Sequence, residues 1–596
     1  MGRPTISHLL IALILLAGLA VRLQGLGAAP LSEAEAQLAV QARSLLAGGG
    51  ESDPGAHPGY AALTGLLFFL FGETDFIARL VPALAGSLLV LAPWILRDRL
   101  GTPAALLLSA GLALDPILVG VSRLADGPMF AAGALGLAIS LRIANISGPD
   151  HATRRAAAGI LAALALLAGP PVWLGLTMLL VAWIAGRVFG LRLPDREPLS
   201  YRSPEAIGFG LALILAGTLF LRAPSGLGAF GGSIGVFLGG FIREAAVPAL
   251  WLLIALAGYQ GFIVLFAAVH TWRVGASARP ADRAAWVFLL AGVTVLVFYR
   301  GRAVSDLVWV VLPLWVLAAA GIAAVLGTRS TPVYRPGLLA LILVILMISF
   351  WVNLASFSNT FLQDPNLWLR VMVLVGTLVL AGLSAVLVGL GWEPDSAKSG
   401  IAWALVVLIV FGLLKGIFGG SHLASPERRD LWLPSPLAGE TGLLADTLHD
   451  LGGWSAGSPL ALDVVQSTES PSVDWVLREF PNVTRTASLS REDLPGIVIT
   501  ESDSQGFRFE SAYRGQGLTW RVRVLWNEMT GSDWLRWMLF KEAPAVSEQL
   551  IVWARADLFL TGGEVVQEDL PVDSSTAPVP EELVPLEDVE EIFPDG

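Results

Sequence analysis

The sequence predicts a mainly α-helical protein that crosses a membrane many times and ends in a small α/β domain. Of its 596 residues, 55% are hydrophobic and only 15% are charged, and the mean hydropathy is +0.68. A soluble globular protein carries about 25% charged residues, so this composition is typical of a polytopic membrane protein. After residue 420 the apolar runs shorten and turn residues become frequent, which indicates that the α/β domain begins there.

Thirteen apolar segments are long enough to cross a bilayer, which takes about 17–25 residues. We expect spans near residues 6–26, 80–97, 103–122, 128–146, 155–170, 171–189, 205–222, 246–270, 284–300, 304–327, 335–356, 367–391 and 400–419. The first segment, with Arg3 before it and small residues after it, also fits a cleaved signal peptide. We expect a retained helix instead, because further spans follow it.

The apolar run GYAALTGLLFFLFG, residues 59–72, is not among the thirteen. It is short for a span, and runs of this length are more often interfacial or re-entrant helices. If it does not cross, nearly all basic clusters fall on one side of the membrane, as the positive-inside rule requires. The C-terminal domain then lies on the other side, so we expect a cytoplasmic-membrane protein with an extracytoplasmic C-terminal domain.

The predicted organisation has three parts. Residues 1–420 form the transmembrane domain, in which 27–79 are an outer loop that carries a juxtamembrane helix. Residues 421–560 form the α/β domain, with strands expected at 460–466, 496–501, 518–526 and 548–559 and helices at 472–480 and 533–542. Residues 561–596 are a tail that we expect to be disordered, because 560–596 hold eleven acidic and no basic residues, equal to the net charge of −11.

Several function classes are excluded or disfavoured. The absence of cysteine excludes disulfides, thiolate metal sites and cysteine nucleophiles. Six scattered histidines argue against a histidine-rich zinc site, and the chain has no basic stripe for nucleic acid. Neither GxGxxG nor GxxxxGK[ST] occurs in the α/β domain, so nucleotide binding there is unsupported. The glycine-rich segment 226–240 leads no strand–helix unit, and we expect it to be a flexible outer loop.

Charged residues gather in the loops that this topology places outside. Charges at membrane level are costly unless they are paired or hydrated, so they favour a functional cavity, although loops of any polytopic protein carry interfacial charges. The set is Glu33, Glu35, Asp53, His57, Arg79, Arg123, Asp126, Arg300, Arg302 and Asp306.

Three stretches resemble a known family. The sequences PLSEAEAQLAVQARSLLAGG, HPGYAALTGLLFFLFGETDFIARLVPALAGSLLVL and SRLADGPMF are similar to protein O-mannosyltransferase-like (dolichyl-phosphate-mannose-protein mannosyltransferase) glycosyltransferases of the GT-C fold. The nearest subgroup is the flippase-associated membrane proteins of bacteria and archaea. The resemblance is specific over residues 1–145 and returns faintly in DWVLREF and WLRWMLFKEAP.

The resemblance can be followed residue by residue. His57-Pro58 matches the family's His-Pro motif before a juxtamembrane helix, Arg79 matches the arginine that opens the second span, and residues 122–126 match Ser-Arg-x-x-Asp. The family's Asp-Glu pair falls on Ala34-Glu35, so its aspartate, the proposed general base or ion ligand, is lost. Glu33 stands one residue earlier and would point about 100° away on a helix.

The resemblance implies that a sugar moves from a polyprenyl-phosphate donor to a protein, lipid or glycan acceptor outside the membrane, by inverting chemistry. We expect further contacts with membrane lipids and other membrane proteins. The implied catalytic residues are Glu35, Glu33 and Asp126; the donor-phosphate ligands are Arg123, Arg300, Arg302 and Arg79; His57 and Asp53 lie on the acceptor side. Glu35 and Asp126 are also the implied ligands of Mg²⁺ or Mn²⁺.

The loss of the family aspartate at Ala34 leaves a second function open. The chain would then be a catalytically degenerate scaffold that presents its outer domain to cell-envelope partners. A transporter is the weakest reading, because the sequence shows no repeat of interrupted helices in two halves. Neither the sugar nor the acceptor follows from the sequence.

Overall fold

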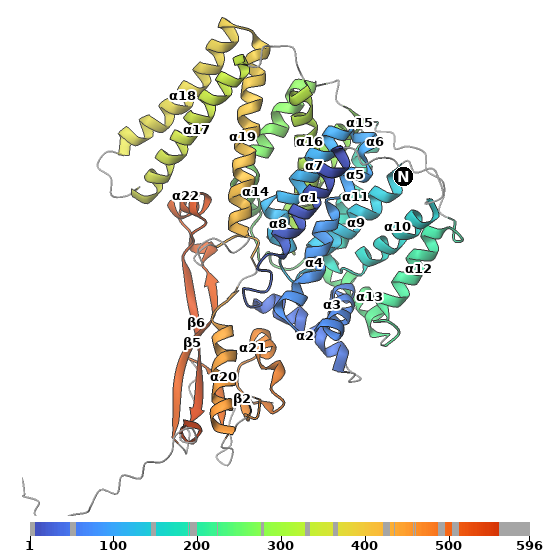
Figure 1. Ribbon diagram of the computed structural model, residues 1–596, viewed down its shortest axis with the longest axis vertical. Coiled ribbons are helices and arrows are strands. Elements are labelled where there is room, and N and C mark those ends of the chain that lie inside the picture. Colours follow the sequence, from blue (N-terminus) through green and yellow to red (C-terminus); the bar gives the residue numbers. More distant parts are fainter. Residues whose placement is uncertain are drawn as a thin grey trace, which may run out of the picture.

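The computed structural model describes residues 6–47, 55–144, 151–188, 190, 200–222, 224–275, 279–327, 334–360, 367–420, 429–433, 436–456, 458, 460–486, 495–502 and 512–559. It consists of a large helical bundle and a C-terminal domain built on a sheet (Figure 1). We use "C-terminal domain" for the described residues between 429 and 559. The predicted fold class, a polytopic helical membrane protein followed by a sheet-containing domain, is confirmed.

The bundle contains nineteen α-helices among the described residues. They are α1 Ile6–Leu23, α2 Glu33–Ala47, α3 Pro58–Phe71, α4 Asp75–Leu89, α5 Ala92–Ile95, α6 Arg97–Leu100, α7 Thr102–Leu114, α8 Pro116–Ser122, α9 Gly127–Ile143, α10 His151–Leu166, α11 Pro170–Val188, α12 Pro204–Gly217, α13 Ser225–Gly239, α14 Ala249–Val274, α15 Pro280–Phe298, α16 Val308–Gly327, α17 Tyr334–Thr360, α18 Leu367–Gly391 and α19 Pro394–Gly420. A 3₁₀ turn, η2 (Val304–Leu307), precedes α16.

Nine helical stretches of the described chain are long and apolar enough to cross a membrane, and the bent pair α7–α8 would make a tenth. Three of the thirteen expected spans, those beginning at 128, 155 and 205, correspond to α9, α10 and α12. These helices have 17, 16 and 14 residues. They lie at or below the lower end of the about 17–25 residues that cross a bilayer, which accounts for the smaller number of described spans.

The segment at 59–72 forms a separate helix, α3, of 14 residues. It starts with Pro58, whose missing N–H costs nothing in the first helical turn. It ends at Gly72, where φ is 89°, a conformation that favours glycine. The helix packs against α2 and α4. Its position at the membrane surface stays a prediction.

The expectation of a flexible loop at 226–240 is wrong, because residues 225–239 form α13. Glycine disfavours helix by about 1 kcal/mol per residue relative to alanine. Packing outweighs that tendency here. The Phe230 ring lies 5.8 Å from the ring of Trp173 on α11, whose indole N–H donates to Ser233 Oγ at 2.9 Å. At the other end of α13, Phe237 stacks on Tyr299 with ring centroids 5.2 Å apart.

A buried aspartate shapes the break between α7 and α8, which are bent by 53°. Asp115 caps α8 by accepting from the backbone N–H groups of Ile117 and Leu118, both at 3.0 Å. Its other oxygen accepts from Gln260 at 2.6 Å and from Trp315 at 2.7 Å. These bonds satisfy the carboxylate inside the bundle. They also fix α8, which leads directly to Arg123 and Asp126.

The C-terminal domain holds a six-stranded sheet of order β1-β5-β6-β4-β2-β3. The strands are β1 Leu437–Ala438, β2 Val464–Gln466, β3 Val483–Arg485, β4 Ile497–Glu501, β5 Tyr513–Val524 and β6 Ala545–Arg555. Strand β2 is parallel to β3 and β4, and the other pairs are antiparallel. Helices α20 (Thr441–Ala456), α21 (Pro471–Val476) and α22 (Gly531–Phe540) and the 3₁₀ turns η3 (Leu477–Glu479), η4 (Trp526–Glu528) and η5 (Ala556–Phe559) complete it.

Helices α21 and α22 are among the elements that dock the C-terminal domain on the bundle. Helix α21 lies on α2 (Figure 1), where the Trp475 indole N–H donates to Asp75 Oδ1 at 2.6 Å. Helix α22 lies near α14, because Trp534 packs on Trp251 with ring centroids 6.2 Å apart. Aromatic pairs of this kind bury much apolar area and hold their relative orientation. These contacts help to fix the domain on the bundle.

Candidate active site

The two glutamates in the first turn of α2 have different partners. Glu35 is buried and forms an ion pair with Arg79, with Nε–Oε1 at 2.8 Å and Nη2–Oε2 at 3.0 Å. It also accepts from the backbone N–H and hydroxyl of Ser32 and from the backbone N–H of Ala125 at 3.0 Å. Burial opposes its ionisation, but the charge and hydrogen bonds of Arg79 outweigh burial, so the pKa of Glu35 is lowered.

Arg79 connects this glutamate to the loop after α1. Its guanidinium also donates to the carbonyl oxygens of Leu26 at 3.1 Å, Ala29 at 2.6 Å and Pro30 at 3.0 Å. Together with the two bonds to Glu35, these contacts use all five N–H groups that an arginine has. Arg79 and Glu35 therefore hold the α1–α2 loop, the start of α2 and the loop before α9 in one arrangement.

Glu33 faces the C-terminal domain. Its Oε1 accepts from the hydroxyls of Ser470 at 2.6 Å and Ser472 at 2.8 Å, at the start of α21. Arg521 on β5 lies 3.9 Å from the same oxygen. Ala34, between the two glutamates, is exposed. The first turn of α2 therefore joins the bundle core on one side to the C-terminal domain on the other.

A second acidic cluster forms where three loops meet. Asp126 precedes α9 and accepts from the backbone N–H of Gly127 at 2.6 Å, and Ser305 of η2 donates to it. Asp306, also in η2, is buried, accepts from the backbone N–H of Ala303 at 2.8 Å, and experiences the negative charge of Asp126. The η2 turn thus brings Asp306, far from Asp126 in sequence, near enough for the two negative charges to interact.

His57 lies beside this pair. Its Nδ1 is 2.8 Å from the carbonyl oxygen of Ala168, and a Cβ atom placed on Gly127 would lie 2.7 Å from the same nitrogen. Glycine at 127 therefore allows the imidazole to approach the backbone next to Asp126. Burial raises the pKa of Asp126 above its ordinary value, while the charge of His57 acts in the opposite direction and that of Glu35 adds to the rise.

Like Arg79, two other predicted phosphate-binding arginines contact backbone carbonyl groups. Arg123 donates to the carbonyls of residues 21, 22, 24 and 25, and so caps the C-terminal end of α1. Arg302 donates to the carbonyls of residues 247, 296, 297 and 299, and so caps α15. To bind a phosphate, either side chain would have to leave these carbonyls. Their phosphate-binding role stays a prediction, as does that of Arg79.

Arg300 differs from these arginines because its side chain is exposed. It lies next to the η2 turn that carries Asp306. Arg243, in the loop after α13, is also exposed, and its charge acts on Tyr299. Of the two residues predicted on the acceptor side, His57 lies in the cluster described above, and Asp53 lies outside the described residues.

The expected divalent cation finds no support in the described part of the chain. It contains no group of three or more His, Cys, Asp or Glu side chains that could hold a metal ion. Glu35, one of the two expected ligands, already has both oxygens on the Arg79 guanidinium. A cation there would compete with a positive charge that is already present. The arrangement therefore does not fit a metal bound by Glu35 and Asp126, and no chemical step is assigned to one.

Sequence reasoning noted Asp306 as a charge on the outer face but gave it no role, and it did not find Arg243. The available signal for Asp306 was its position, an acidic residue at the very start of an expected span, where an unpaired charge is costly. For Arg243 the sequence offers no signal, because it follows a segment that was expected to be a loop.

Two solved structures share this architecture. The crystal structure of ArnT from Cupriavidus metallidurans bound to undecaprenyl phosphate has a TM-score of 0.53 and 15% sequence identity, covering 83% of this chain and 93% of that one. The apo form gives a TM-score of 0.50 and 15% identity, covering 83% and 92%. No protein-family model and no curated protein matches the sequence. The likeness confirms the GT-C fold that the resemblance predicted, and the subgroup stays a prediction.

Proposed function

We propose that this protein is a membrane glycosyltransferase that moves a sugar from a polyprenyl-phosphate-linked donor to an acceptor outside the cytoplasmic membrane. The observation that carries the proposal is Asp126, which lies beside His57, accepts from Ser305 of η2 and interacts electrostatically with the buried Asp306 of the same turn. The GT-C fold supports it, because a protein with this fold, ArnT, has been crystallised with undecaprenyl phosphate.

In the proposed reaction Asp126 is the general base. An acceptor hydroxyl attacks the anomeric carbon of the sugar, a new carbon–oxygen bond forms, and the bond from that carbon to the phosphate oxygen breaks. The bonding electrons leave with the phosphate, and the hydroxyl proton passes to Asp126. A pKa raised by burial makes Asp126 a stronger base than an ordinary aspartate.

Asp306 supplies the second carboxylate of the site. The family aspartate that would stand at position 34 is lost, and Ala34 is exposed and carries no polar group. Asp306 reaches Asp126 from η2 instead, and its negative charge favours uptake of a proton by the pair. The site therefore keeps two carboxylates, although one of them comes from a different part of the chain.

The departing phosphate needs positive charge. We assign this role first to Arg300, because its guanidinium is exposed beside η2 and suits bidentate contact with phosphate oxygens. Arg243 is a second candidate at the same face. In this proposal, and unlike the expectation from the sequence, Arg79, Arg123 and Arg302 position the site, since each holds loop or helix-end carbonyls.

Glu35 and Glu33 are likewise assigned to positioning. Glu35 orients the backbone at Ala125, directly before Asp126, and Glu33 fixes the C-terminal domain through α21. In this proposal the C-terminal domain lies on the extracytoplasmic side and helps to hold the acceptor.

One observation favours the alternative of a catalytically degenerate scaffold. The acidic pair at the start of α2 is incomplete at Ala34, and both remaining glutamates are occupied by protein partners. A scaffold would need the same contact of Glu33 with α21, which holds the C-terminal domain on the bundle. It would not need Asp126 and Asp306 next to His57.

The test is a transfer assay with the full chain in lipid vesicles, using polyprenyl-phosphate sugars and a panel of protein and glycan acceptors. Asp126→Asn removes the base, and we expect its rate to fall by about 10²–10⁴-fold, the usual contribution of general-base catalysis. Asp557→Asn, in an exposed ion pair with Arg555, is the matched control and should transfer normally. Equal rates for both variants, or no transfer by the parent chain with any donor, would favour the scaffold.

A further inference from the structure

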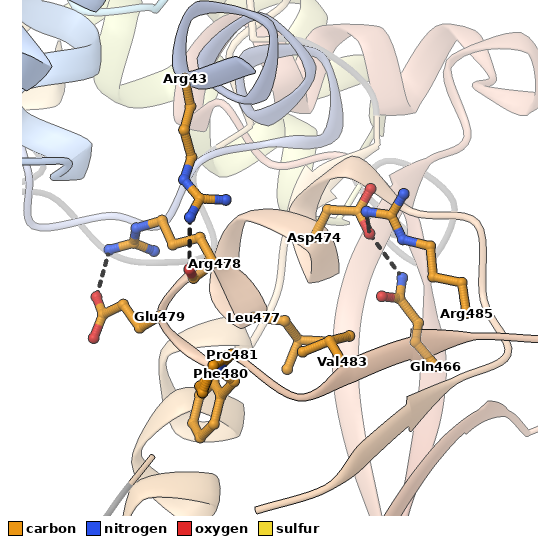
Figure 2. A pocket seen from close by; sticks show the side chains of 10 residues that line it. All are labelled: Arg43, Gln466, Asp474, Leu477, Arg478, Glu479, Phe480, Pro481, Val483 and Arg485. Atoms are coloured by element: carbon orange, nitrogen blue, oxygen red, sulfur yellow. Dashed lines mark hydrogen bonds and ion pairs between the residues drawn. The ribbon is translucent and has the colours of Figure 1, made fainter. Parts of the chain in front are cut away.

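A polar cavity lies between α2 and the C-terminal domain, apart from the carboxylate pair. Its volume is about 670 Å³, within the range of about 300–1,000 Å³ usual for ligand sites. Arg43 lines it from α2. The remaining lining residues come from the β2–α21–β3 unit, and they are Gln466, Asp474, Leu477, Arg478, Glu479, Phe480, Pro481, Val483 and Arg485 (Figure 2).

The position of the cavity is one at which α/β sheets bind ligands. Strands β2 and β3 are parallel and are joined through α21, and their last residues are Gln466 and Arg485. Both residues line the cavity. Ligands of open α/β sheets bind outside the carboxyl ends of parallel strands, because the connecting helices diverge there and leave a crevice.

The charges around the cavity are balanced in pairs. Arg485 Nη2 lies 2.7 Å from Asp474 Oδ1, Arg478 Nη2 lies 3.0 Å from Glu479 Oε1, and Arg43 Nε lies 2.8 Å from Glu73 Oε2. An isolated anion such as phosphate would have to displace a carboxylate from its arginine. A neutral ligand with hydroxyl groups could accept from the guanidinium groups and donate to the carboxylates without breaking any pair.

Two further features suit a neutral polyhydroxylated ligand. Gln466 is 1% exposed, and its Nε2 donates to Asp474 Oδ1 at 3.1 Å and to the carbonyl of Thr468 at 2.6 Å. Its Oε1 accepts from no described group but is itself buried, so a ligand hydroxyl reaches this oxygen only if the amide moves. Figure 2 shows this amide between Val483 and Asp474, and the apolar side chains of Leu477 and Val483 form the wall that would meet sugar C–H groups.

We infer that this cavity is a binding site for a neutral oligosaccharide. Its paired arginines and carboxylates provide both donors and acceptors for sugar hydroxyl groups, and Leu477 and Val483 provide an apolar wall. If the cavity is interpreted as the place where a glycan acceptor is held, the inference rests on the proposed function. As a carbohydrate-binding site it does not.

The test is isothermal titration calorimetry of the full chain in detergent with maltotriose, cellotriose and mannotriose, and separately with inorganic phosphate. We expect at least one trisaccharide to bind and phosphate not to bind. Arg485→Ala should weaken that binding about tenfold or more, the effect of losing one charge-assisted hydrogen bond. Val483→Trp, which fills the cavity, should abolish it.

Arg523→Ala is the matched control, because Arg523 is an exposed arginine of the same sheet, paired with Glu548 at 2.6 Å and away from the cavity. It should bind the trisaccharide as the parent chain does. The inference is overturned if no trisaccharide binds, if phosphate binds in competition, or if Arg485→Ala and Val483→Trp bind normally. Trisaccharide binding that depends on Arg485, in a chain that transfers no sugar, would support this inference while overturning the proposed function.

Discussion

Removing Glu35 should destabilise the bundle strongly, because it leaves the Arg79 charge buried without its partner. Only 4% of the Glu35 side chain and 6% of the Arg79 side chain are exposed. Breaking a buried ion pair from one side costs about 3–5 kcal/mol. Glu35→Ala also releases the backbone N–H groups of Ala125 and Ser32. We therefore expect a loss at the upper end of that range.

The magnitude can be measured by unfolding the protein in mixed micelles with increasing sodium dodecyl sulfate, for Glu35→Ala, Arg79→Ala and the double variant. The double variant should be less destabilised than the sum of the single variants, because no unpaired charge remains; couplings of about 0.5–3 kcal/mol are usual for contacting residues. Asp395→Ala, which breaks an exposed pair with Lys398 on α19, is the control and should change stability by at most about 1 kcal/mol.

The pH dependence provides a second readout of the same pair. The pKa of Glu35 is lowered in the folded protein, so its contribution to stability is complete above the pKa of about 4.3 of an unfolded glutamate. That contribution is lost as the pH falls through the folded value. The parent chain should therefore lose stability on acidification more steeply than Glu35→Ala. Two results together would refute the stabilising ion pair between Glu35 and Arg79. The stability losses of the single variants would add up to that of the double variant, and stability would fall equally with pH in the parent chain and in Glu35→Ala.

Three further predictions concern the site and the domain contact. In a pH–rate profile, the transfer rate should rise with pH through an inflection above the ordinary aspartate pKa of about 3.9, because burial raises the pKa of Asp126. The Asp306→Asn variant should move that inflection to lower pH, since it removes a like charge near Asp126. Glu33→Gln should weaken the docking of α21, measured as faster hydrogen exchange at the start of α21, with α22 unchanged. Gly127→Ala should displace His57, because the added Cβ would lie 2.7 Å from its Nδ1, and should lower the transfer rate while the protein still folds.

Each of these has a contradicting result. If the inflection does not move in Asp306→Asn, Asp306 does not affect the pKa of the general base Asp126. Unchanged exchange in Glu33→Gln would remove the role of Glu33 as an inter-domain contact. Normal transfer by Gly127→Ala would show that the position of His57 does not matter to the reaction.

Composition and segment length were enough to predict the helical membrane part and several elements of the C-terminal domain. The strand expected at 496–501 is β4, and the helices expected at 472–480 and 533–542 overlap α21 and α22, which begin one and two residues earlier. Helix α20 and the short strands β1 and β3 were not predicted. Strands of two and three residues are too short to show an alternating pattern, and their pairing with distant strands defines them.

The candidate site was predicted as a set of residues but not as a set of contacts. Glu35 and Arg79 were both named, but their ion pair joins residues 44 positions apart, which no local pattern reveals. Asp306 comes under the influence of the Asp126 charge because Ser305 of the same η2 turn bonds Asp126, the residue before α9. The loss of a carboxylate at Ala34 was visible in the sequence, whereas the carboxylate proposed to replace it became visible only in three dimensions.

The most direct test of the proposed active site is a cryo-electron microscopy map of the full chain in lipid nanodiscs with undecaprenyl phosphate added. We expect phosphate density within hydrogen-bond distance of the Arg300 guanidinium, beside η2 and on its Asp126 side. Phosphate density at another face of the bundle, with this position filled only by protein side chains, would contradict it.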